Sequence, residues 1–378
     1  MARNARTALV LPGGGARAAY QAGVLAAICE MLPDATENPF PILCGTSAGA
    51  INAATLACNA ENFRAAVANL NEVWRNMRAH HVYRADPLGV AASGAKWLSA
   101  LALGWFFRKS PRSLLDNEPL RGLLGAWLDF NNIDRAIAAG KLHAVSISAS
   151  GYTSGHSVSF FQGRAEIESW NRINRFGSRD RLSVDHLMAS AAIPFVFPAI
   201  RLHREWFGDG SMRQLAPVSP AIHLGAEKIL VIGAGRMSEK AERQRGQSYP
   251  SLAQIAGHAL SSIFLDGLAV DIERMQRINR TLSIIPEGVR AGQGVALRPI
   301  ETLVIAPSER LDHLAARHAR ALPRSVRTLL RGIGAMNRSG GALTSYLLFE
   351  QPYTRALIDL GFRDTVAREA EVRAFLEI

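Results

Sequence analysis

The chain has 378 residues, of which 48% are apolar and 20% are charged, and its formal net charge at pH 7 is +11. This length and apolar content exclude a disordered or fibrous protein, and they suffice for one large domain with an appendage or for two domains. The positive charge favours anionic partners, but no aromatic-rich motif, zinc-finger spacing or long Lys/Arg block indicates nucleic acid, so we expect no nucleic-acid partner.

Strands and helices alternate at the start of the chain. Residues 6–12 and 40–44 are short apolar runs typical of buried strands. A glycine turn after each run leads into a helical pattern, at 16–32 and at 47–60. The repeated order of strand, turn and helix predicts an α/β fold with a mainly parallel central sheet and helices on its faces.

The chain continues with the same mixture of elements up to residue 235. Helices fill most of 61–140. The elements after them are strands at 142–150 and 156–163, a helix at 182–193 that ends before Pro194, a hairpin at 200–211 that closes on Asp209-Gly210, and a strand at 228–235.

A charged loop at 236–247 marks the expected boundary between an α/β domain, residues 5–235, and a mostly helical C-terminal region, residues 236–378. We expect this region to pack on the α/β domain or to follow it. Its helical patterns lie at 251–279, 311–321, 324–334, 341–349 and 352–376, and the apolar runs at 281–286 and 301–307 are candidates for late strands of the sheet.

One apolar stretch approaches the length of a membrane span. Residues 88–107 contain a single charge, Lys96, but also three glycines and two serines. A buried or lid helix is the favoured interpretation, an interfacial helix is the second, and a true span is the third.

The cysteines and the N-terminal residues indicate in which cellular compartment the protein resides. Cys29, Cys44 and Cys58 are an odd number at spacings that match no metal site, so we expect buried free thiols in a reducing compartment. The apolar run near the N-terminus is too short for the core of a signal peptide. The sequence therefore predicts a cytoplasmic protein without a signal peptide, able to act at the periphery of a membrane.

The motif Gly45-x-Ser47-x-Gly49 lies where a predicted strand meets a helix. A serine there can occupy a sharp turn that presents its hydroxyl as a nucleophile, and the glycines admit the strained backbone and close packing. The N-terminus of the following helix also favours negative charge. The alternative is an ordinary Gly/Ser-rich turn.

The glycine loop at 12–23 admits two interpretations. Its pattern Gly13-x-Gly15-x-x-Ala18 fits a loose dinucleotide-binding fingerprint, but the acidic residue that should end the second strand is missing. Alternatively, its N–H groups form a cradle for an anionic oxygen at a helix N-terminus, which suits an oxyanion formed at Ser47. Arg17 either adds positive charge there or is an exposed helix-surface arginine.

A nucleophilic serine needs a base. All ten histidines lie downstream of Ser47, and none sits in a recognisable catalytic loop. Asp209 is followed by glycine at a predicted strand-to-loop junction, where its carboxylate could be directed across the sheet. The alternative is a plain Asp-Gly turn.

Four motifs occur in an order that resembles the patatin-like phospholipases: GGGAR at 13–17, GTSAG at 45–49, ASAAIPFVFP at 189–198 and DG at 209–210. The resemblance covers residues 7–235 and implies a three-layer α/β/α sandwich. Two positions depart from the usual motifs. Ala18 stands where the first motif usually ends in glycine. Ser211 stands where the last usually has glycine or alanine, a difference expected at the rim of the pocket.

The resemblance also implies a mechanism. Ser47 would be the nucleophile, Asp209 the base of a Ser-Asp dyad, and the N–H groups of Gly13, Gly14, Gly15 and Ala16 the oxyanion hole. The supporting residues would be Arg17, Gly45, Gly49 and Gly210. A lone carboxylate needs shielding from water to act as a base near neutral pH, so Asp209 should be at least partly buried.

The implied activity is hydrolysis of lipid acyl esters, of the phospholipase A, lysophospholipase or carboxylesterase type, without a cofactor or metal. The partners would be a lipid ester and an anionic membrane surface. The arginine-rich helices at 310–331 either contact this surface or are a solvated face of the protein. The alternatives are a catalytically weak lipid-binding protein, an acyltransferase on the same fold, and a nicotinamide-dependent oxidoreductase.

Overall fold

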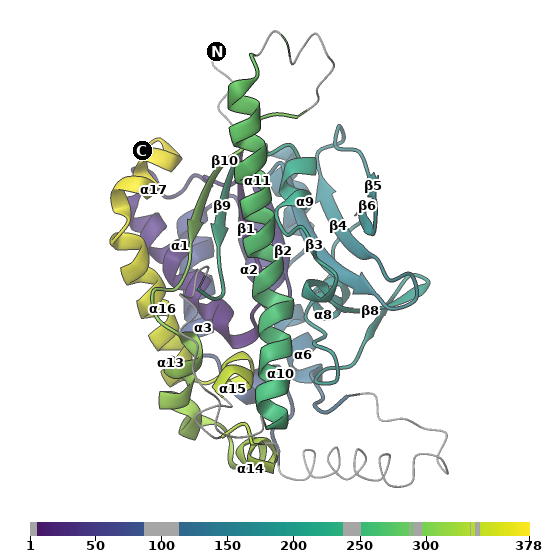
Figure 1. Cartoon of the computed structure of the whole chain (residues 1–378), viewed down its shortest axis with the longest axis vertical. Helices are drawn as coiled ribbons and strands as arrows, with labels where there is room; N and C mark the ends of the chain where they lie inside the picture. The colour runs from purple at the N-terminus through teal and green to yellow at the C-terminus, as the bar shows by residue number, and fades with distance from the viewer. Residues whose placement is uncertain are drawn as a thin grey trace.

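The structure is a computed structural model, and it describes residues 6–86, 113–236, 251–286, 289, 297–332, 334–336 and 341–378. A ten-stranded sheet runs through its centre (Figure 1). The strands are β1 (Thr7–Leu11), β2 (Ile42–Thr46), β3 (Ala144–Gly151), β4 (Ser157–Gly163), β5 (Trp170–Arg172), β6 (Arg175–Arg179), β7 (Ile200–Leu202), β8 (Glu205–Asp209), β9 (Lys228–Ile232) and β10 (Glu301–Ile305).

The main path of the sheet has the order β10-β9-β1-β2-β3-β4-β6-β5. The five strands from β10 to β3 are all parallel to their neighbours, whereas β4 runs antiparallel to β3. Strand β8 also pairs with β3, in antiparallel orientation, and β7 pairs with β8. The prediction of a mainly parallel central sheet is confirmed.

Helices connect the strands and continue to the C-terminus. They are η1 (Gly15–Ala18), α1 (Ala19–Met31), α2 (Ala48–Cys58), α3 (Phe63–Arg75), α4 (Ala79–Val82), α6 (Glu118–Trp127), α7 (Asn131–Ala138), α8 (Val184–Ser190), η2 (Gly210–Met212), α9 (Ser219–His223), α10 (Leu252–Ser261), η3 (Ser262–Asp266), α11 (Gly267–Ile284), α13 (Leu311–His318), η4 (Ala319–Ala321), α14 (Arg324–Gly332), α15 (Gly341–Leu347), α16 (Gln351–Val366) and α17 (Glu369–Leu376).

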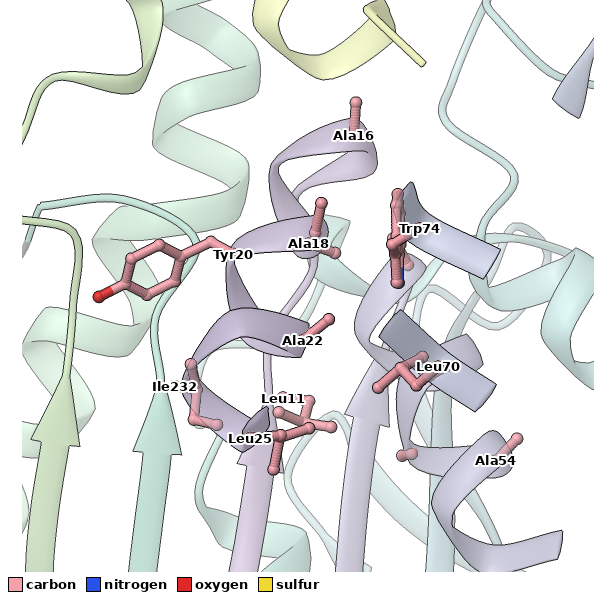
Figure 2. Close-up of a cluster of buried hydrophobic side chains, with 14 of the residues drawn as sticks. Leu11, Ala16, Ala18, Tyr20, Ala22, Leu25, Ala54, Leu70, Trp74 and Ile232 are labelled. Atoms are coloured by element: carbon pink, nitrogen blue, oxygen red, sulfur yellow. The ribbon is translucent and has the colours of Figure 1, made fainter. Parts of the chain in front are cut away.

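Both faces of the sheet are covered, as the apolar run of β1 requires. Because side chains alternate along a strand, Leu9 and Leu11 face one layer of helices, while Ala8 and Val10 face the other. Figure 2 shows the first layer, where Leu11 of β1 meets Leu25 of α1 beside α3. The second layer is formed by α9 and α11. The predicted three-layer arrangement is therefore present.

The C-terminal region contributes to the same layers. Strand β10 extends the sheet by pairing with β9, and α16 lies along α1. The apolar run at 301–307 is thus a strand, as expected. The run at 281–286 is not, because α11 continues through it to Ile284. The division of the chain near residue 236 stays a prediction.

Two further differences concern loops. The hairpin at 200–211 turns at His203 and Arg204, between β7 and β8, so Asp209-Gly210 ends the second strand and does not close the hairpin. The short strands β5 and β6 were not predicted. The stretch 88–107 lies outside the described residues.

In the described part of the chain, one continuous helix, Ala253–Ile284, is long and apolar enough to cross a membrane. It runs along the sheet (Figure 1), and it buries Phe264, Leu268 and Ile272 in the protein core. Packing against the sheet accounts for part of its apolar composition, because 33% of its most apolar 18-residue stretch is buried.

Candidate active site

Ser47 lies on the sharp turn between β2 and α2. Its backbone has φ 55° and ψ −130°, outside the regions that residues with side chains normally adopt. A Cβ at Gly49 would lie 2.1 Å from the carbonyl oxygen of Leu11, so only glycine lets the start of α2 pack this closely on β1. Gly45 is confined in the same way by the backbone of Ala50. The close packing of helix and strand therefore holds Ser47 in a strained conformation.

Asp209 ends β8 and reaches Ser47 across the sheet. Strand β8 pairs with β3, where Ala149 is its neighbour, and β3 lies beside β2. The Ser47 hydroxyl donates to Asp209 Oδ2 over 2.6 Å. The other carboxylate oxygen, Oδ1, accepts from the backbone N–H of Ser211 at 2.9 Å. Both oxygens therefore have donors, which fixes the orientation of the carboxylate.

Burial changes the acidity of Asp209. The residue is 0% exposed, and its removal from water raises the pKa of the carboxyl to about 6, although the hydrogen bonds from Ser47 and Ser211 act in the opposite direction. The expected shielding of this residue is confirmed. At neutral pH the carboxylate is ionised, yet it is a stronger base than an ordinary aspartate.

No histidine takes the place of Asp209. All ten histidines fall in described parts of the chain, and none of them hydrogen bonds to Ser47 or Asp209 there. Two of them, His186 and His203, hydrogen bond to a different carboxylate, that of Asp180. The Ser47 hydroxyl is therefore paired with a carboxylate alone.

The glycine loop between β1 and η1 lies directly beside Ser47. A Cβ at Gly13 would be 2.8 Å from the Ser47 Cβ. Within the described residues, the N–H groups of Gly14, Gly15 and Ala16 donate no hydrogen bond. Gly15 has φ 54°, and a Cβ on it would lie 2.3 Å from the Tyr346 carbonyl oxygen. The loop thus offers free amide donors next to the hydroxyl.

Of the two interpretations of Arg17, the exposed helix-surface arginine is wrong, whereas added positive charge at the loop stays a prediction. Arg17 is buried, so it is not a surface arginine. Its Nε donates to Ser345 Oγ at 2.8 Å, and its guanidinium lies 4.0 Å from the centre of the Tyr346 ring. The side chain therefore ties η1 to α15 of the C-terminal region. It does not line the cavity beside Ser47.

That cavity is narrow, with a volume of about 40 Å³, and it is lined almost entirely by apolar side chains. Ser47 and Gly15 form part of its wall. The remaining wall comes from α2, α3, α4, α6, the residues between α3 and α4, the loop after α8 and the residues after α15. It includes Trp74, Met77, Leu120, Leu124, Ile193, Phe197 and Phe349. Figure 2 shows Trp74 projecting from α3 near the start of η1. A cavity of this kind suits a hydrocarbon chain.

Comparison with known protein families gives a match to the patatin-like phospholipases over residues 9–222, which is more than half of the chain. The chain belongs to the patatin-like phospholipase family. A comparison with curated proteins finds no match. Membership of this family supports lipid acyl hydrolysis as the general activity of the chain, with lipids as its substrates.

Sequence reasoning did not identify Ser190 as part of the site. The hydroxyl of this α8 residue accepts a hydrogen bond from the backbone N–H of Ser47 at 2.8 Å and donates one to the Ser148 carbonyl at 2.6 Å. It thereby holds the strained turn at Ser47 against β3. The available signal was its place in the ASAAIP segment at 189–194. That segment indicated the family resemblance but did not show which residues Ser190 contacts.

Sequence reasoning also missed a buried chain of hydrogen bonds that joins an indole, two side-chain amides and a backbone carbonyl. Trp74 Nε1 donates to Asn52 Oδ1, Asn52 Nδ2 donates to Gln21 Oε1, and Gln21 Nε2 donates to the Pro12 carbonyl, over 2.8, 2.8 and 2.9 Å. It links the cavity wall to the start of the glycine loop. Asn52 and Gln21 each interrupt a run of mostly apolar residues, and that contrast was the signal in the sequence.

Proposed function

We propose that this chain hydrolyses lipid acyl esters through an acyl-enzyme formed on Ser47. The observation that carries the proposal is the 2.6 Å hydrogen bond from the Ser47 hydroxyl to the fully buried Asp209 carboxylate. An apolar cavity begins at the same serine. A nucleophile, its base and a place for an acyl chain therefore adjoin one another.

In the first step, Ser47 Oγ attacks the carbonyl carbon of the ester, and its proton passes to Asp209. The carbonyl oxygen becomes an oxyanion, which accepts hydrogen bonds from the N–H groups of Gly14, Gly15 and Ala16. The bond to the alcohol oxygen then breaks, and the alcohol leaves with the proton that Asp209 holds. The acyl group remains on Ser47 as an ester.

In the second step, water replaces the alcohol. Asp209 accepts a proton from the water, whose oxygen attacks the acyl carbon, and the same N–H groups hold the second oxyanion. The bond to Ser47 Oγ breaks, and Asp209 returns its proton to that oxygen. A fatty acid leaves, and the Ser47–Asp209 hydrogen bond forms again.

The test is turnover of a panel of phospholipids, lysophospholipids and neutral glycerides by purified protein. We expect Ser47→Ala and Asp209→Ala each to reduce kcat by roughly 100-fold or more, since a nucleophile or general base contributes at least this much. The matched control is Ser146→Ala, because Ser146 is buried in β3 and its hydroxyl has no partner in the described residues. Circular dichroism checks the fold of each variant.

Two results would contradict the proposal. One is lipid binding without turnover in the unmodified protein, which indicates a catalytically silent lipid-binding protein. The other is turnover that survives in both Ser47→Ala and Asp209→Ala. Transfer of the acyl group to an added alcohol in preference to water would instead redefine the second step as acyl transfer.

A further inference from the structure

Three potential metal ligands come together away from Ser47. Asp180 follows β6, His186 lies in α8, and His203 occupies the turn between β7 and β8. Their ligand atoms all lie within 4.8 Å of one another. We propose that these three side chains bind a divalent transition-metal ion of the zinc class. Their positions along the chain show no ligand spacing, which is why the sequence predicted no metal site.

The distances suit one shared ion. Asp180 Oδ2 is 3.3 Å from His186 Nε2 and 2.5 Å from His203 Nε2. Around a tetrahedral zinc with bonds of about 2.0–2.2 Å to nitrogen and oxygen, the ligand atoms lie roughly 3.3 Å apart. Small movements of the exposed His203 side chain would therefore complete the geometry. Two imidazoles and one carboxylate are ligands that zinc accepts readily.

The two less exposed ligands are already oriented by neighbours. His186 Nδ1 lies 3.0 Å from Ser183 Oγ, so its Nε2 is the nitrogen directed at the group. Asp180 Oδ1 accepts from the Arg181 N–H at 2.8 Å, which leaves Oδ2 for the metal. Hydrogen bonds of this kind on the far atoms of ligands are typical of metal sites.

The group is also open on one side. His186 is buried and Asp180 is partly buried, whereas the side chain of His203 is 64% exposed. The Phe160 ring packs against His186, with ring centres 4.9 Å apart, and closes the inner side. An ion can therefore enter from solvent, and water can supply the remaining ligand.

Such an ion would act on the framework of the active site. Helix α8 ends at Ser190, which holds the Ser47 amide, and β8 ends at Asp209. The ion would tie α8 to the β7–β8 hairpin at their far ends. It would stabilise the relative position of these two elements and take no part in the chemistry at Ser47.

The test uses the full-length protein without a histidine tag, freed of metal by chelation and dialysis. Calorimetric titration with Zn²⁺ should show one ion per chain, and Co²⁺ should give the visible absorption bands of a tetrahedral site. His203→Asn removes one ligand at φ 51°, a conformation that asparagine tolerates. We expect this change to weaken Zn²⁺ binding by roughly 100-fold or more, because loss of even an outer-shell partner costs about 10–100-fold.

Three further variants complete the design. Ser183→Ala should weaken Zn²⁺ binding by about 10–100-fold, since it removes only the orienting partner of His186. His313→Ala removes an exposed histidine of α13 and should leave affinity unchanged. Ser47→Ala should bind Zn²⁺ as the unmodified protein does, which separates this proposal from the proposed hydrolysis. The proposal fails if the unmodified protein binds no Zn²⁺, or if His203→Asn binds it equally well.

Discussion

Asp209 is the ionisable residue on which the proposed hydrolysis depends. Its burial raises the carboxyl pKa to about 6, and it must be ionised to accept the proton of Ser47. We therefore expect kcat/KM to fall by about tenfold per pH unit below pH 6 and to be independent of pH just above 7.

A soluble short-chain ester, assayed between pH 4.5 and 8, measures this profile without changes in a lipid surface. An acid limb near pH 6 agrees with a buried carboxylate base. A rate that stays constant down to pH 4.5 would show that the base has an ordinary aspartate pKa, which the burial of Asp209 does not allow.

Ionisation of the same buried carboxylate lowers the free energy of unfolding at neutral pH. The pKa of Asp209 in the folded state is higher than its ordinary value of 3.8, so between these two pH values the folded state holds the proton more tightly than the unfolded state. The stabilising contribution of the proton is complete below pH 3.8 and is lost as the pH rises through about 6. The loss amounts to about 3 kcal/mol at pH 7.

Asp209→Asn should remove this dependence, since asparagine does not ionise. We expect the free energy of unfolding of the variant, relative to the unmodified protein, to increase by about 2–3 kcal/mol between pH 4 and pH 7. Urea titrations at the two pH values measure it. A difference that does not change with pH would mean that the carboxyl titrates alike in both states.

At the scale of elements, the site depends on how closely α2 packs on β1. Gly49→Ala would place a methyl group 2.1 Å from the Leu11 carbonyl oxygen, which the backbone can relieve only by moving α2. We expect a loss of about 2 kcal/mol or more in the free energy of unfolding, together with a large loss of turnover, because Ser47 moves with the helix.

Gly122 of α6 provides the matched control. A Cβ there would meet nothing within 4 Å, so Gly122→Ala should stabilise the protein by about 0.4–1 kcal/mol through the unfolded state. Thermal denaturation and turnover are measured for both variants. Equal effects of the two changes would show that the packing of α2 on β1 is not the determining factor.

The elements that were predicted correctly are those with strong local patterns. Strands β1, β2 and β9 are short apolar runs beside glycine, and α1 and α2 are long Ala-rich helices, so their periodicity identified them. Strands β5 and β6 are short, rich in arginine and only partly buried, and they form through pairing with β4 and with each other. Such pairing is invisible in a local pattern.

The interpretation of 281–286 failed for a related reason. The apolar residues of this run suit a strand, but α11 already extends along the sheet and continues through them. The hairpin at 200–211 turned earlier than expected because Asp-Gly is only a tendency, and His203 takes the positive φ instead. Ser47 and Asp209 were found through motifs, whereas Ser190, Asn52 and Gln21 act through distant contacts that no motif records.

At the scale of the whole molecule, the net charge of +11 favours an anionic lipid surface. Helix α14 buries Val326 and Leu330 and carries arginines on its outer side, so it is a candidate for the contact face. We expect binding to vesicles that contain phosphatidylglycerol, weak binding to pure phosphatidylcholine, and loss of the preference in about 1 M salt, where screening acts within roughly 3 Å.

Vesicle co-sedimentation measures this binding. Replacing the exposed Arg320, Arg324 and Arg331 by glutamate should weaken it strongly, while turnover of a soluble ester stays unchanged. Equal binding to neutral and anionic vesicles would show that charge does not direct the protein to membranes.

The most direct test of the Ser47–Asp209 assignment is the site and rate of labelling by a fluorophosphonate, followed by mass spectrometry of the peptides. We predict one adduct, on Ser47, formed roughly 100-fold or more slowly in Asp209→Ala because the base is lost, and at an unchanged rate in His203→Asn. An adduct on another residue, or labelling of Asp209→Ala at the full rate, would contradict the assignment.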